Sequence, residues 1–361
     1  ACPFSGYQLS GGFDALGVDA VGALPGLVNV SGSVEADEKR GAMTLANRHM
    51  QLDMPRAFAA PLTFDSLSGQ VSWTIDAGRY DIRFAELNFA NPDLEGSLRG
   101  TYQMSGEGYG TADPAGSRIP DDARRVTHYL PLVVSQKTRD WVRDAIVAGY
   151  SSDVKWRLKG DLKQFPFDRA GKDGTFEVLA KARGGILEYA PGWPRIENIT
   201  ADVHFIANRL EVKSSAASIF GVQLSGVQAV IPNLKIHYEV IDVAGEAEGQ
   251  TAEFKSLIVA RPGAQKIDRF TDGMEAQGRG RLALKLVLPL RELERSRVAG
   301  SYWFLANRLR VDSALPPLEK VDGRLDFTES SVQGQDIEAQ IFGGPARLAI
   351  EARDGGVHVS A

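Results

Sequence analysis

The chain has 361 residues, of which 43% are hydrophobic and 24% are charged, a balance typical of an ordered protein. The formal net charge of −5 argues against a nucleic-acid partner, and the single cysteine, Cys2, excludes an intrachain disulfide. No stretch approaches the roughly 20 apolar residues of a membrane helix, and the first residues lack the basic and apolar regions of a signal peptide. We interpret the chain as an internal piece of a longer protein.

Alternation of apolar and polar residues predicts β-strands along most of the chain. The segment 64–73 reads FDSLSGQVSW, and the segment 281–290 reads RLALKLVLPL, with leucine at every second position. A period of two is typical of a half-buried strand. Because buried parallel strands give continuous apolar runs instead, the pattern favours antiparallel sheets with one wet face.

Three segments predict short helices: 121–130, 135–149 and 251–260. The second is the best defined, because Trp141, Ala145 and Ala148 fall on one apolar stripe. Ser135 can cap the start of this helix, and Gly149 can end it. The glycine-rich segment 105–120 reads SGEGYGTADPAGSRIP and predicts a loop.

One phrase recurs along the chain: FIANRLEVKS at 205–214, FLANRLRVDS at 304–313 and LANR at 45–48. A longer frame, 193–221, also aligns with 315–343 without a gap, which indicates repeated supersecondary units. Asn tolerates left-handed turn conformations, so we predict hairpin tips at Asn47, Asn208 and Asn307. In the same frame, Phe205 and Phe327, with Trp73 in a weaker copy, are predicted to point inward.

A many-stranded sheet with one apolar face must cover that face. With few helices available, two solutions stay open: a closed sandwich, or an open groove that receives an apolar ligand.

Candidate catalytic and metal-binding residues do not form recognisable motifs. The five histidines are scattered, no G-x-S-x-G sequence occurs, and GEGYG at 106–110 lacks the Lys-Ser/Thr ending of a phosphate loop. Carboxylates such as Asp140 and Asp144 stand beside arginines and are expected to be solvated ion pairs. The residues therefore argue against an enzyme, and we expect neither a cofactor nor a metal.

Several phrases, in this order and spacing, resemble the AsmA-like envelope proteins and, within them, the YhdP group. They are LPGLVNVSG (24–32), HYLP (128–131), WVRDAIVAG (141–149), KGDLKQFPF (159–167), LEYAPGWP (187–194), LVLPL (286–290) and IFGGPARL (341–348). The resemblance covers essentially the whole chain. Segment 105–120 matches least well.

The resemblance implies a mainly β fold: an elongated, strongly curved antiparallel sheet that forms a hydrophobic groove, with about three short helices. We expect one continuous rod divided into a first groove segment (1–120), a helical insertion (121–150), a second groove segment (151–250), a short helical insertion (251–272) and a third groove segment (273–361).

The resemblance also implies a function. Such a protein lies in the periplasm, is anchored in the inner membrane by an N-terminal helix outside this chain, and meets the outer membrane or envelope proteins at its far end. Its cargo is phospholipid, carried between the two membranes. Two rival hypotheses remain: a closed β-rod that acts as a structural or assembly scaffold of the envelope, and a hydrolase of envelope polymers, which the absence of catalytic motifs disfavours.

The alternation identifies the side chains expected to contact acyl chains, and the helix 135–148 is the natural lid. The predicted lining residues are Val71, Trp73, Ile82, Phe84, Trp156, Leu158, Val203, Phe205, Leu284, Leu286, Leu288, Tyr302, Phe304, Leu325 and Phe327. The predicted lid residues are Trp141, Ala145 and Ala148.

The predicted rod can be tested by small-angle scattering on the monomer. About 20 strands stacked at ~4.8 Å give a length near 100 Å and a radius of gyration of roughly 28 Å or more. A compact protein of this chain length would have a radius of gyration of about 21 Å. A measured value near the compact one would rule out the elongated groove.

Overall fold

The computed structural model describes residues 6–22, 24–104, 109–119, 122–161, 164–165, 167, 174–234, 240–259, 275–290, 292–310, 315–353 and 356–360. The chain divides into two compact units. The N-terminal unit comprises Ala1–Arg183 and Val203–Asn208, and the C-terminal unit comprises Gly184–Asp202 and Arg209–Ala361. Strands β9 (Gly174–Leu187) and β10 (Ile196–Ile206) contribute residues to both units.

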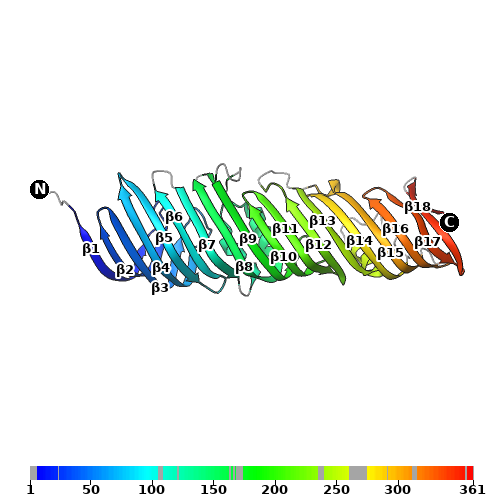
Figure 1. Ribbon diagram of the computed structural model, residues 1–361, viewed down its shortest axis with the longest axis horizontal. Helices are drawn as coiled ribbons and strands as arrows, with labels where there is room; N and C mark the ends of the chain where they lie inside the picture. The colour runs from blue at the N-terminus through cyan, green and yellow to red at the C-terminus, as the bar shows by residue number, and fades with distance from the viewer. Residues whose placement is uncertain are drawn as a thin grey trace. The chain divides into compact units, whose positions relative to one another are not determined.

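The N-terminal unit is an antiparallel meander in which each strand pairs with the next along the chain (Figure 1). Its strands are β1 (Gln8–Val18), β2 (Gly26–Asp37), β3 (Arg40–Asp53), β4 (Leu62–Asp76), β5 (Arg79–Ala90), β6 (Glu95–Met104), β7 (Tyr109–Ile119) and β8 (Ile146–Asp161). Between β7 and β8 lie a 3-10 helix, η1 (Ala123–Tyr129), and the helix α1 (Gln136–Ala145).

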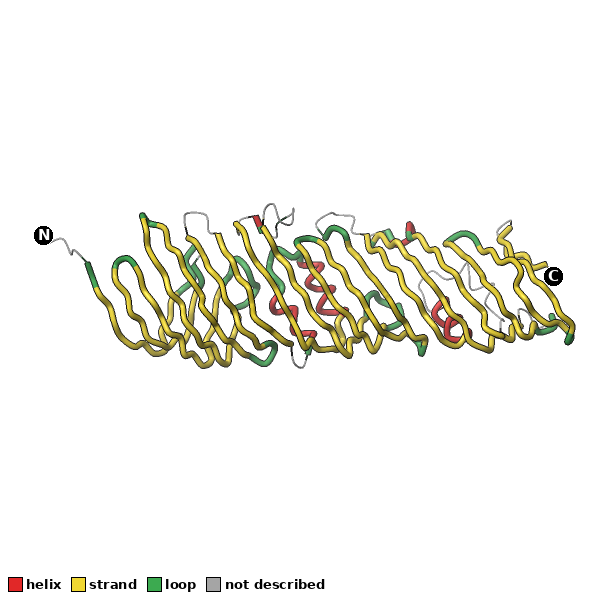
Figure 2. Tube along the Cα trace, viewed as in Figure 1, coloured by secondary structure: helices red, strands yellow, loops and turns green. Residues whose placement is uncertain are grey.

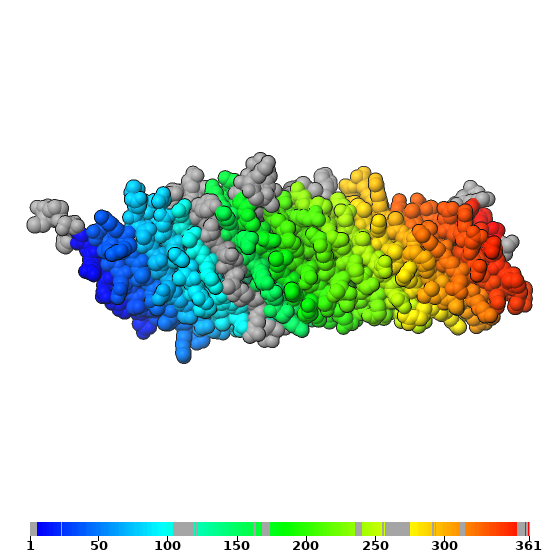
Figure 3. Space-filling model, viewed as in Figure 1, coloured from blue at the N-terminus to red at the C-terminus, as the bar shows by residue number. Residues whose placement is uncertain are grey.

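The C-terminal unit repeats this plan, with each strand paired to the next along the chain. Its surface accordingly passes from green through yellow to red in chain order (Figure 3). Its elements are β11 (Arg209–Ile219), β12 (Val222–Ile231), β13 (Val240–Gln250), α2 (Thr251–Val259), β14 (Glu275–Pro289), η3 (Leu293–Arg295), β15 (Arg297–Arg310), β16 (Leu318–Thr328), β17 (Val332–Ile341), β18 (Gly344–Arg353) and β19 (Gly356–Ser360). The mainly β, antiparallel fold with few helices is thus confirmed for the described residues.

Strict alternation along the strands produces two different faces. In β4, Val71 and Trp73 are half-buried, whereas Ser72 and Thr74 between them are exposed. Residues paired directly across an antiparallel ladder point to the same side of the sheet, so the half-buried positions join into one surface. We call this surface the apolar face of each unit and the opposite surface the polar face.

Bulges near one end of the strands bend each sheet. In the C-terminal unit Ala306, Lys320 and Asp336 have positive φ, and the pairing register shifts beside each of them. In the N-terminal unit Asn29 and His49 also have positive φ. A bulge inserts a residue into one strand and turns it more sharply, so a line of bulges across neighbouring strands curves the whole sheet.

The hydrophobic core of each unit lies at this bend. In the N-terminal unit the core is Val30, Met50 and Phe64, with Val30 and Met50 directly after the bulge residues Asn29 and His49. In the C-terminal unit, the buried core residues are Val222, Ala247, Phe254, Tyr302, Phe304, Leu309, Val321, Ile337, Ala339 and Leu348.

The predicted hairpin tips are wrong at two of the three asparagines. Asn208 does lie in the turn between β10 and β11, but Asn47 and Asn307 lie inside strands and are 3% and 0% exposed. Asn47 Oδ1 accepts a hydrogen bond from the backbone N–H of Ser31 at 2.5 Å. Asn307 Nδ2 donates to the carbonyl oxygen of Arg279 at 2.6 Å. Bulged strands leave backbone groups without ladder partners, and the buried amides supply those partners.

The predicted loop over 105–120 is also wrong for most of its length. Residues Tyr109–Ile119 form β7, which pairs with both β6 and β8. Residues 105–108 and 120 lie outside the described residues. The glycines of this segment indicated turns, but ladder pairing on both sides overrides local propensity.

Replacing Asn307 tests whether its amide holds the bend together. We expect Asn307→Leu to lower the free energy of unfolding by about 1–3 kcal/mol, because the Arg279 carbonyl and the Thr251 hydroxyl lose their partner. Urea denaturation followed by circular dichroism measures the change. Gln333→Ala, at an exposed position of β17, is the control and should change stability by less than about 0.5 kcal/mol. Equal losses in both variants would refute the role of the amide.

Candidate functional site

The apolar face of the N-terminal unit runs as continuous rows across the strands. Val71 is paired with Met43 on one side and Phe84 on the other, and Trp73 with Gly41 and Ile82. Outside β10, six residues of this unit are predicted to line the groove, and all six are half-buried: Val71, Trp73, Ile82, Phe84, Trp156 and Leu158. The exposed residues next to them, such as Arg83 and Lys155, point to the polar face.

The C-terminal unit presents a similar surface on β13 to β16. Leu286 lies between Val243 and Val298 in the pairing register, and Leu284 lies between Gly245 and Gly300. Leu284, Leu286, Leu288, Leu325 and Phe327 are all half-buried. These side chains lie on the half-buried side of their strands, and their role as the lining of a lipid groove stays a prediction.

Glycines give the aromatic side chains of this face room to lie flat on the sheet. A Cβ at Gly41 would run into the ring of Trp73, one at Gly280 into Tyr302, and one at Gly300 into Phe327. Each glycine stands on the strand next to its aromatic partner. The rings therefore lie over the backbone of the neighbouring strand.

Two predicted lining residues are instead part of the core at the bend. Tyr302 and Phe304 are each 8% exposed. The ring of Phe254, from α2, meets the ring of Tyr302 edge-on with centroids 5.2 Å apart. Tyr302 in turn packs against Phe304 at 4.9 Å. Helix α2 therefore covers this part of the apolar face.

A cluster of phenylalanines fills the apolar side of the N-terminal unit beyond β8. Phe205, predicted as lining, meets Phe176 at 5.5 Å between ring centroids, and Phe176 meets Phe165 at 4.9 Å. Phe167 is fully buried, and its ring lies against Gly160 and Gly174, where a Cβ would run into it. Val203, the other lining residue predicted in β10, is half-buried.

Helix α1 is shorter than predicted and buries less of its stripe. It ends at Ala145, which is 1% exposed, and Ala148 already belongs to β8. Ser135 caps its start as predicted, but the helix ends on Ile146 rather than on Gly149. Trp141 is 49% exposed. The extended conformation begins early because Ile146 and Val147 are β-branched and pair into the sheet.

One carboxylate attaches η1 to the turn between β5 and β6. Asp93 accepts hydrogen bonds from Arg125 Nη1 at 2.6 Å and from Tyr129 Oη at 3.3 Å, and lies 3.1 Å from His128 Nδ1. Asn91 Nδ2 also donates to Tyr129 Oη at 2.8 Å. This polar cluster holds the helical insertion against the N-terminal unit.

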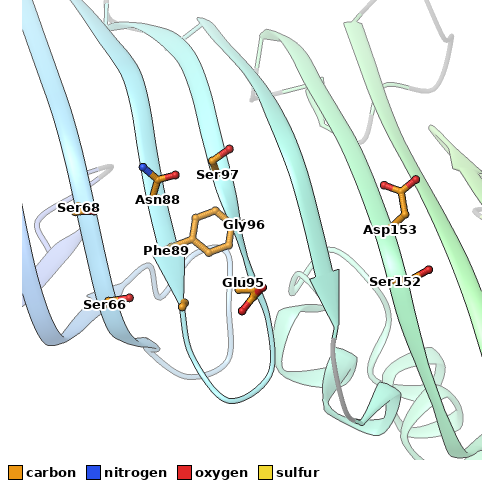
Figure 4. A pocket seen from close by; sticks show the side chains of 10 residues that line it. Ser66, Ser68, Asn88, Phe89, Glu95, Gly96, Ser97, Ser152 and Asp153 are labelled. Atoms are coloured by element: carbon orange, nitrogen blue, oxygen red, sulfur yellow. The ribbon is translucent and has the colours of Figure 1, made fainter.

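A shallow depression of about 570 Å³ lies on the N-terminal unit (Figure 4). Ser68, Asn88 and Ser97 stand side by side on three neighbouring strands of it. Its lining residues are Ser66, Ser68, Asn88, Phe89, Ala90, Glu95, Gly96, Ser97, Ser152 and Asp153. Seven of these ten side chains carry a hydroxyl, amide or carboxylate group, so this depression offers hydrogen-bonding partners that an acyl chain does not use.

Sequence reasoning missed the residues that cover the apolar faces. Phe254 falls inside a segment predicted to be helical, and Phe165 and Phe167 fall inside the phrase KGDLKQFPF, but the sequence pattern predicts no contact for any of the three. Their aromatic character was the available signal. In the described residues, no group of three or more His, Cys, Asp or Glu side chains could hold a metal ion. None of the described helices is both long enough and apolar enough to cross a membrane.

Comparison with known proteins gives two matches. The family described as YhdP protein matches residues 3–361. The chain is similar to the intermembrane phospholipid transporter YhdP of Escherichia coli strain K12, with 21% identity over 339 residues. This match covers 92% of the chain and 26% of the relative, so the chain spans about a quarter of the length of that protein. No solved structure matches the chain.

Acidification should release the helical insertion. Burial raises the pKa of Asp93, but hydrogen bonds from Arg125 and His128 outweigh it and hold the pKa below its ordinary value of 3.8. The anchor therefore stabilises the fold above that pH and is lost as the pH falls below it. We expect amide exchange over residues 123–145, corrected for the intrinsic rate, to accelerate relative to β4 at acidic pH.

Asp93→Asn provides the control for this measurement. The variant lacks the titrating carboxylate, so its insertion should exchange faster at neutral pH and show little further change on acidification. An insertion that stays protected in the native chain at pH values well below the ordinary Asp range would contradict the anchoring role.

Proposed function

Because the chain belongs to the YhdP family, we propose that it carries phospholipids between the inner and outer membranes of a bacterial envelope. The observation that carries the proposal is the half-buried apolar face in each unit, backed by a polar face. The similar protein from Escherichia coli is described as an intermembrane phospholipid transporter. We place the chain in the periplasm, as part of a protein anchored in the inner membrane through a helix outside this sequence.

The physical basis is the transfer of acyl chains from water to an apolar surface. Each buried CH₂ group contributes roughly 0.8 kcal/mol, so the two chains of a phospholipid would be held firmly on rows such as Val243–Leu286–Val298. Sliding from one row to the next changes the buried area little, because successive rows have the same character. The charged headgroup stays in water at the open side, and no catalytic group takes part.

A partly exposed surface is what such a carrier needs. Fully buried side chains would have to open before a lipid could enter, and fully exposed ones would invite aggregation. Leu284, Leu286 and Leu288 fall between these limits. The scaffold hypothesis instead requires these leucines to be closed off by other protein side chains, and this difference can be measured.

Substitution of Leu286 separates the two hypotheses. An arginine there would place a cation among acyl chains, and its long side chain could still reach water from an open face. We expect Leu286→Arg to lose the phospholipid that co-purifies with the chain, measured by mass spectrometry, while keeping its circular dichroism spectrum and melting temperature.

Val287→Arg is the matched control, because Val287 is the next residue on the same strand, points to the polar face and is 38% exposed. It should retain both lipid and fold. Loss of fold together with lipid in Leu286→Arg would indicate a closed core and favour the scaffold. Full retention of lipid in that variant would refute binding at this row.

A further inference from the structure

Helix α2 lies directly on the apolar face of the C-terminal unit. Phe254 is 5% exposed and belongs to the same core cluster as Val222, Ala247 and Tyr302. Figure 2 shows the helix, in red, on the far side of the strands in that view, against β13 and β14. The helix therefore occupies space that a ligand of the apolar face would otherwise fill.

Buried polar contacts fix α2 in this position. The hydroxyl of Tyr302 donates to Thr251 Oγ1 at 2.8 Å, and the Thr251 hydroxyl donates to Asn307 Oδ1. Thr251, Tyr302 and Asn307 are 6%, 8% and 0% exposed. Because all three are satisfied by one another inside the protein, moving α2 away would leave buried polar groups without partners.

Paired glycines make room for this arrangement. Gly249 and Gly280 stand opposite each other on β13 and β14. A Cβ at Gly280 would run into Tyr302, and a Cβ at Gly249 would meet the Glu253 carboxylate at 2.9 Å. Glu253 also accepts a hydrogen bond from the N–H of Gln250 at 3.0 Å, which closes the first turn of the helix. The sheet is thus locally shaped to receive the start of α2.

The apolar face of this unit consequently has two parts. Near the bend, Tyr302 and Phe304 are buried beneath α2. Farther along β14, Leu284, Leu286 and Leu288 stay half-buried, and Leu284 is paired with Gly300, which is paired with Phe327. We call the first part the floor and the second part the wall.

We propose that Phe254 sets the depth of the lipid path: acyl chains contact the wall and are kept off the floor by α2. This inference rests on the proposed function and refines it, since it assigns Phe254 as the residue that limits how many acyl chains lie side by side across the strands. Removing its ring opens the floor to acyl chains.

Photolabelling of the whole chain tests this assignment without altering the surface under study. The probe is phosphatidylethanolamine with a diazirine at the end of one acyl chain, supplied in phosphatidylethanolamine vesicles, and labelled residues are located by peptide mass spectrometry. In the native chain we expect labels on Leu284, Leu286 and Phe327, and only background on Tyr302 and Phe304. In Phe254→Ala, labels on Tyr302 and Phe304 should rise to the level of Leu286.

Phe342→Ala is the matched control, because Phe342 is 90% exposed in the turn between β17 and β18 and touches neither floor nor wall. It should leave the labelling pattern unchanged. Should Phe254→Ala fail to fold, Thr251→Val removes the hydroxyl that joins Tyr302 to Asn307 while keeping the ring, and should also raise floor labelling.

The outcomes distinguish the two levels of the proposal. Floor labelling in the native chain, or an unchanged pattern in both α2 variants, overturns the role of Phe254 while leaving lipid binding in place. An apolar face that takes up no label at either part overturns the proposed function itself.

Discussion

The structure depends on one constraint: a sheet with a single apolar face has to bend in order to bury part of that face. Left-handed backbone at a residue other than glycine costs roughly 1–2 kcal/mol, and this chain accepts that cost at neighbouring positions such as Ala306, Lys320 and Asp336. The residue after each of the last two, Val321 and Ile337, is almost completely buried. Burial of an aliphatic side chain contributes about 1.5–3 kcal/mol. The burial of the side chain that each bulge turns inward therefore offsets the conformational cost of the bulge.

The bend also determines which side chains of the apolar face are buried and which stay exposed to solvent. Side chains next to the bulges become core, whereas side chains farther along the strands stay partly exposed to solvent. One strand therefore contributes to the buried core at one end and to a partly exposed apolar surface at the other. Gly280 and Leu286 illustrate this on β14, since the first lies under Tyr302 and the second is half-buried and is paired with Val243 and Val298.

Strand positions and side-chain orientation could be predicted from the sequence because both follow from alternation alone. The runs at 64–73 and 281–290 were assigned to the correct face on this basis. The bulges could not be predicted, because the residues with positive φ, such as Lys320 and Asp336, are not glycines and no local pattern marks their positions. The sequence also does not predict which side chains cover the apolar face. Phe254 meets Tyr302 only through tertiary packing, and no local pattern records that contact.

The recurring phrase LANR shows how much a repeat can specify. Both copies that lie inside strands place a buried asparagine near a bend, so the repeat encodes the bend and not a turn. Asn307 uses both ends of its amide, one for the Arg279 carbonyl and one for Thr251 at the start of α2. Asn47 accepts from Ser31, but among the described residues its Nδ2 has no partner. The contact of Asn307 with Thr251 comes from helix α2, which lies outside the repeat. The fold is repeated from unit to unit, whereas the cover of the apolar face is specific to each unit.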